Sequence, residues 1–181
     1  MQITISTIPI DKAQCLNLVL GFFSDERPPQ GAGGLIDWRL NGLISRELAR
    51  GRLSGAFREE LILFHPGRLK TEAILFYGLG EAKDITLERL YEAGRGVTST
   101  MIGISRPDFT LTLPGARHGN LDMASMTEAL LTGCFEVVAS RGEPPGKLPS
   151  LAAEPNSLAE AISGFNRFQR NHNIYELRIV D

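Results

Sequence analysis

The fold is decided by a run of eight mostly apolar residues, LNLVLGFF at residues 16–23. Such a run is typical of a β-strand that is covered on both faces. The next segment, SDERPPQGAGG at residues 24–34, contains two prolines and three glycines, so we expect neither helix nor strand there. A one-face apolar pattern then predicts a helix over residues 35–50, which Gly51 is placed to end.

The chain on both sides of this unit continues to alternate strands with helices. Apolar runs and period-two patterns predict further strands at residues 2–6, 60–65, 73–78, 108–113 and 174–180. Helical spacing of apolar residues predicts helices at residues 87–102, 123–140 and 157–170. Residues 141–156 hold four prolines and two glycines, and we expect a surface loop or linker there. The pattern predicts an α/β fold with a mixed sheet of about six strands flanked by helices.

Length and composition narrow the class of protein. We expect residues 1–181 to form a single domain, and 43% hydrophobic residues exclude disorder as the dominant state. The net charge is -2, so a nucleic-acid partner is not expected. The sequence shows neither a signal peptide nor a membrane-length apolar run, and we expect a cytoplasmic protein without membrane contact. Cys15 and Cys134 form no Cys-x-x-Cys pair, which predicts free thiols.

The sequence offers little for hydrolytic chemistry. The three histidines, His65, His118 and His172, stand in loop-like contexts, and no Gly-x-Ser-x-Gly elbow accompanies them. The adjacent acids Glu59 and Glu60 precede a predicted strand, where neighbouring side chains point to opposite faces. We therefore expect no catalytic residues, no metal site and no cofactor.

The sharpest local feature is the glycine-rich segment at residues 31–37, which follows a buried strand and opens a helix. Backbone N–H groups at such a turn point toward an anion, so Gly31, Gly33, Gly34 and Asp37 are candidate ligand-binding residues. The segment is neither a P-loop nor a Gly-x-Gly-x-x-Gly fingerprint. A tight crossover that needs glycine for its backbone shape, a phosphate cradle and a subunit contact all remain open.

A second glycine-bearing loop follows the strand predicted at residues 108–113 and also precedes a helix. Its candidate binding residues are Gly115, Ala116, Arg117 and His118, of which the arginine adds a cation. Ligands of open α/β sheets bind outside the carboxyl ends of the strands, so both loops are placed to wall one crevice. An ordinary exposed loop is the alternative.

Four segments carry a family resemblance: FFSDERP at 22–28, GGLIDWRLNG at 33–42, GRLSG at 51–55 and ILFYGLG at 74–80. They resemble the N-terminal domain of the leucyl (cytosol) aminopeptidase family. The resemblance implies a macrodomain-like, three-layer fold. It also makes residues 31–37 similar to the glycine-rich loop with which macrodomains hold the phosphates of ADP-ribose.

Two departures limit what the resemblance implies. The Asn-Thr-Asp-Ala-Glu-Gly-Arg segment of the family's separate catalytic domain has no counterpart here, so we expect no aminopeptidase activity. The Asn-Ala-Ala-Asn segment that many macrodomains use for the distal ribose is replaced by SDER at residues 24–27.

Two functions follow as expectations. The first is a stand-alone, non-catalytic relative of the aminopeptidase N-terminal domain with an accessory, assembly or regulatory role, through self-association or a partner protein. The alternative is a module that binds a phosphate or nucleotide, an anionic small molecule, at the glycine-rich loop. ADP-ribosyl hydrolysis ranks lowest, because no well-placed base is visible. Trp38, beside the loop, is expected to be a buried brace whose removal costs on the order of 3 kcal/mol.

Overall fold

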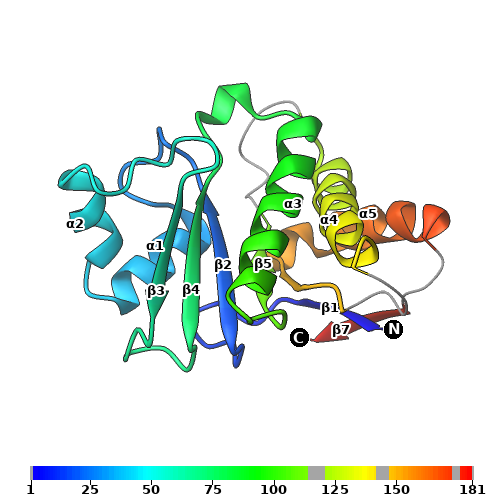
Figure 1. Ribbon diagram of the computed structural model, residues 1–181, viewed down its shortest axis with the longest axis horizontal. Helices are drawn as coiled ribbons and strands as arrows, with labels where there is room; N and C mark the ends of the chain where they lie inside the picture. Colours follow the sequence, from blue (N-terminus) through cyan, green and yellow to red (C-terminus); the bar gives the residue numbers. More distant parts are fainter. Residues whose placement is uncertain (1, 114–120, 142–146, 173–175, 181) are drawn as a thin grey trace.

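The protein is a seven-stranded sheet between two layers of helices (Figure 1), as a computed structural model describes it for residues 2–113, 121–141, 147–172 and 176–180. The strands are β1 (Gln2–Ser6), β2 (Asn17–Phe22), β3 (Glu60–Phe64), β4 (Ala73–Gly78), β5 (Thr110–Thr112), β6 (Ser150–Ala152) and β7 (Glu176–Val180). The helices are α1 (Gly31–Arg39), α2 (Leu43–Ala49), α3 (Leu87–Gly103), α4 (Met123–Ala139) and α5 (Leu158–Asn171), with short 3-10 turns η1 (Ala82–Asp84) and η2 (Pro155–Ser157).

The strand order is β3-β4-β2-β5-β6-β1-β7, and only the β3–β4 pair among them is antiparallel. The expected mixed sheet flanked by helices is therefore confirmed, with seven strands instead of about six. Because six strands run in the same direction, their carboxyl ends meet at one edge of the sheet. That edge is where a ligand would be sought.

Alternating side chains of the central strands build a core on each face of the sheet. In β4, Ile74 and Phe76 pack with the residues under α1 and α2, whereas Leu75 and Tyr77 pack with those under α3, α4 and α5. All of β4 is buried, as expected of a strand with helices on both faces.

The predicted helix over residues 35–50 is wrong in its start and in its continuity. Helix α1 begins at Gly31, and a break separates it from α2. The backbone φ angles of Asn41 and Gly42 are 57° and 74°, in the left-handed region, which ends one helix and starts the next in a new direction. The expected stop at Gly51 holds, with φ at 68°.

The expectation of a surface loop or linker over residues 141–156 needs a correction. Residues 150–152 form β6, which lies between β5 and β1 within the sheet. A strand of three residues is too short to show a period in sequence, and prolines at both sides hide it. Residues 142–146 lie outside the described residues.

Within the described parts of the chain, none of the helices combines the length and the apolar composition that a membrane crossing requires.

Candidate functional site

A crevice of about 400 Å³ opens at the carboxyl edge of the sheet. It is walled by residues that follow four parallel strands: Thr7 to Ile10 after β1, Phe23 and Glu26 after β2, Leu113 after β5, and Ala153 to Pro155 after β6. The first turn of α1 forms another part of the wall, through Gly31, Ala32, Gly33 and Leu35. The crevice lies where the topology of parallel strands predicts a ligand site.

The start of α1 supplies the polar part of this wall. The N–H groups of Gly31, Ala32 and Gly33 have no acceptor among the described residues, and Gln30 caps the helix with no side-chain bond. The first turn contains no acidic residue. Unsatisfied N–H groups and the helix dipole together attract negative charge. The crevice thus carries one feature of an anion site.

Two carboxylates oppose that feature. Glu26 and Glu154 are the charged side chains that line the crevice within the described residues. One carboxylate oxygen of Glu154 is 3.4 Å from the position that a Cβ would take at Gly31. Glu154 has no hydrogen-bond or ion-pair partner for its carboxylate among the described residues, so it is free to turn toward or away from the helix start.

Gly31 and Gly33 are the predicted binding residues that the structure places at the crevice. Gly31 also has a φ of 50°, which favours glycine at this start of the helix. Gly34 is not among the lining residues: a Cβ there would lie 2.7 Å from the Pro29 carbonyl oxygen. Gly34 is therefore required for a close approach of the backbone.

Asp37 does not line the crevice either, and the structure gives it another task. It is buried, and one carboxylate oxygen accepts hydrogen bonds from the N–H groups of Ile44 (2.7 Å) and Ser45 (3.1 Å). The other oxygen accepts from the Ser45 hydroxyl. The carboxylate thus caps the start of α2 from the preceding helix, a structural role.

The second loop contributes one described residue, Leu113, to the wall. The candidates Gly115, Ala116, Arg117 and His118 lie outside the described residues. Sequence reasoning missed the wall after β1 and the wall after β6, including Glu154, because both follow strands whose place in the sheet the sequence did not reveal. No cluster of three or more potential metal ligands occurs among the residues that the structure describes.

The expectation of a buried Trp38 is wrong. Its side chain is 70% exposed on α1, and the Arg39 guanidinium lies 5.0 Å from the centre of its ring. An ion pair of 2.8 Å with Asp11 holds that arginine in place. Trp38 and the 44% exposed Leu35 stand one turn apart, outside the core.

Solved structures show which fold this is. The chain is similar to a mutant of the Oceanobacillus iheyensis macrodomain, with a TM-score of 0.66, 11% identity and coverage of 92% of both chains. It is also similar to the Trypanosoma brucei macrodomain in complex with ADP-ribose, with a TM-score of 0.69, 14% identity and coverage of 90% of this chain and 67% of that one. A mutant of tomato leucine aminopeptidase matches with a TM-score of 0.59 and 18% identity, over 89% of this chain and 35% of that one. The fold is macrodomain-like, as expected.

Sequence comparison adds the family. A probable cytosol aminopeptidase of Pseudomonas syringae pv. tomato is 25% identical over 122 residues, which are 67% of this chain. The match spans only 24% of that relative's length. Residues 19–143 match the N-terminal domain of the cytosol aminopeptidase family. Sequence and fold agree, and the chain belongs to the cytosol aminopeptidase family as a relative of its N-terminal domain.

Proposed function

We propose that this domain is non-catalytic and binds a small anionic molecule in the crevice at the carboxyl edge of the sheet. The observation that carries the proposal is the start of α1, where three N–H groups without acceptors among the described residues face a cavity of about 400 Å³. The Trypanosoma brucei macrodomain, of similar fold, has been solved with ADP-ribose, which makes phosphate the first chemistry to try. This is the alternative function that the sequence suggested, and the accessory or assembly role stays a separate prediction.

The carboxylate of Glu154 offers a test of anion binding in the crevice. Glu154 beside the helix start repels an anion, so Glu154→Gln should strengthen anion binding. Calorimetric titration of ADP-ribose, ADP and inorganic phosphate into wild type and Glu154→Gln measures this. Glu176→Gln is the matched control, because Glu176 begins β7 and so lies at the opposite edge of the sheet. The absence of binding by all three probes in both proteins contradicts the proposal.

The non-catalytic part has its own test. Leucine p-nitroanilide with zinc or manganese should give no turnover. A rate near an ordinary enzyme's, roughly 1 per second or faster, contradicts it.

The exposed pair on α1 favours a second function, contact with a protein partner or a second copy. Leu35 lines the crevice, Trp38 presents apolar surface one turn further along α1, and aromatic residues are enriched at the centres of interfaces. The molecular mass measured by light scattering over a concentration series tests self-association. A mass that rises with concentration in wild type and stays monomeric in Trp38→Ala supports it, and a monomer in both contradicts it.

A further inference from the structure

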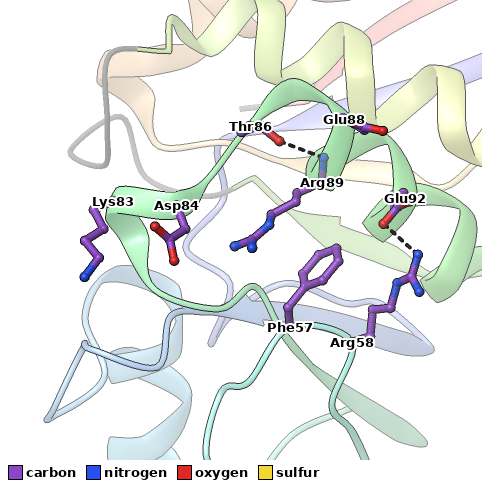
Figure 2. Close-up of a pocket in the computed structure, with 8 residues that line it drawn as sticks. All are labelled: Phe57, Arg58, Lys83, Asp84, Thr86, Glu88, Arg89 and Glu92. Carbon is purple, nitrogen blue, oxygen red and sulfur yellow. Dashed lines mark hydrogen bonds and ion pairs between the residues drawn. The ribbon is translucent and has the colours of Figure 1, made fainter.

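A second hollow, of about 750 Å³, lies apart from the crevice and shares no lining residue with it. Its walls come from the loop that precedes β3, from η1 and from the first turns of α3 (Figure 2). We call it the α3 cleft. Because the two hollows have no lining residue in common, the proposal below is independent of the function proposed for the crevice.

The centre of the α3 cleft is an aromatic ring between two arginines. The guanidinium carbon of Arg89 is 5.1 Å from the centre of the Phe57 ring, and that of Arg58 is 5.4 Å away. Figure 2 shows the ring between the two side chains, with Arg89 on the side of η1. Stacking on a ring attracts a guanidinium and restricts its orientation. The Arg89 side chain is therefore already ordered and loses less conformational entropy when it binds a ligand.

Two of the three described cations that line the α3 cleft are paired with carboxylates. Arg58 pairs with Glu92 at 2.6 Å, and Lys83 pairs with Glu81 at 2.7 Å. The Arg89 backbone N–H donates to the Thr86 hydroxyl, but its guanidinium has no carboxylate within ion-pair distance among the described residues. Among the residues that the structure describes, the donors of this half-buried guanidinium thus have no acceptor, and they lie inside the cleft.

The charge of the lining decides which anion fits. A guanidinium fork binds carboxylate or phosphate through two parallel hydrogen bonds. Asp84, Glu88 and Glu92 also line the cleft, so an anion that enters it needs a cation to offset their charge. A carboxylate needs one cation, which Arg89 supplies, whereas a phosphate dianion needs a second one, and Arg58 and Lys83 are already paired. The lining therefore favours a carboxylate.

We propose that the α3 cleft binds a carboxylate of a partner polypeptide through Arg89. The α3 cleft is a shallow, open hollow, so a polypeptide can lie across it, and its mixture of charged and aromatic walls suits the residues on either side of a Glu or Asp. Glu81, paired with Lys83 at the rim, adds to the charge that disfavours strongly acidic segments.

The test follows the Arg89 side-chain Nε–H signal in spectra of the ¹⁵N-labelled protein. The probes are the acetylated, amidated tetrapeptide Gly-Gly-Glu-Gly, its Gly-Gly-Gln-Gly counterpart, sodium acetate and inorganic phosphate, at constant ionic strength. We expect a saturable shift with the Glu peptide, weaker binding of acetate and phosphate, and no shift with the Gln peptide. The Arg89 variants lack this signal, so their peptide affinity is measured from the backbone amide signals of the cleft residues. Arg89→Gln should weaken the Glu peptide about tenfold or more, as loss of a charge-assisted hydrogen bond does.

Arg95→Gln is the matched control. Arg95 lies on the same helix and stacks on Tyr91 at 5.9 Å, but it has a carboxylate partner, Glu136, at 3.8 Å. We expect it to change peptide affinity by less than about twofold, since distant exposed charges are screened. Arg89→Lys keeps the charge without the fork and should bind weakly.

Three results overturn the proposal. An Arg89 signal that none of the probes shifts in the wild-type protein contradicts binding at Arg89, whatever the variants do. If phosphate binds more tightly than the Glu peptide, the ligand is not a carboxylate. If acetate binds as tightly as the Glu peptide, the residues around the carboxylate add nothing and the ligand is not a polypeptide.

Discussion

Gly34 and Pro29 lie so close together that a methyl group at residue 34 would be 2.7 Å from the Pro29 carbonyl oxygen. The oxygen belongs to the backbone, so it cannot turn aside. We expect Gly34→Ala to lower the free energy of unfolding by about 1–3 kcal/mol, the usual cost of overpacking. Urea denaturation measures the loss.

Gly33→Ala is the matched control for that prediction. A Cβ at residue 33 would meet only the Cβ of Pro29, at 3.4 Å, and the φ angle of Gly33 is not in the left-handed region. The change should leave stability within about 0.5 kcal/mol, or raise it, because Ala favours helix. Equal losses in both variants would show that the close approach at Gly34 does not matter.

Asp37 supplies the second prediction, because three donors converge on its buried carboxylate. Asp37→Ala leaves the N–H groups of Ile44 and Ser45 without that acceptor, and we expect a loss of about 2–3 kcal/mol. Ser45→Ala removes a single bond and should cost about 1 kcal/mol. Urea denaturation of the two variants should rank them in this order, and the reverse order would contradict a capping role.

Trp38 gives a prediction opposite to the one its sequence context suggested. With a side chain that is 70% exposed, Trp38→Ala should change the free energy of unfolding by less than about 0.5 kcal/mol. Phe165 is 1% exposed, and Phe165→Ala should cost about 3–5 kcal/mol. Thermal denaturation of both variants checks the contrast, and a large loss from Trp38→Ala would contradict the exposed position.

The error on Trp38 has a simple geometric source. The buried residues Ile36, in α1, and Leu40, directly after its last residue, each lie two positions from Trp38, and positions two apart on a helix face away from each other. The spacing of the apolar residues therefore predicts that Trp38 lies on the exposed face of the helix. An aromatic residue beside a glycine-rich turn suggests a brace, but the position of Trp38 in the helical period places its side chain outside the core.

The parts of the site that could be predicted follow segments long enough to show a sequence pattern, and the parts that could not follow shorter ones. Residues 16–23 could be recognised as a buried strand because eight residues carry a pattern, and the turn that follows brought Gly31 and Gly33 to the crevice. Strand β6 spans residues 150–152 and carries none. Glu154 became part of the crevice only through the pairing of β6 with β1 and β5, a long-range contact that no local pattern encodes.

The last prediction concerns alkaline pH. Burial and, to a smaller extent, the nearby Glu60 carboxylate raise the pKa of Tyr77 to about 12. In the unfolded chain tyrosine ionises near pH 10, so between pH 10 and 12 the unfolded state loses a proton that the folded state keeps. Stability from this group is complete below pH 10 and falls as pH rises through that window.

Tyr77→Phe removes the titrating group while keeping the ring in the core. The wild type should lose about 1 kcal/mol more stability than Tyr77→Phe between pH 7 and pH 11. Urea denaturation at both pH values gives the difference, in which other groups cancel, including the buried Cys134 thiol, whose pKa burial raises to about 12. Equal losses in the two proteins would mean that the Tyr77 hydroxyl ionises as readily in the folded chain as in the unfolded one. Its contact with α3, where a Cβ at Gly96 would lie 2.8 Å from the hydroxyl oxygen, argues against that.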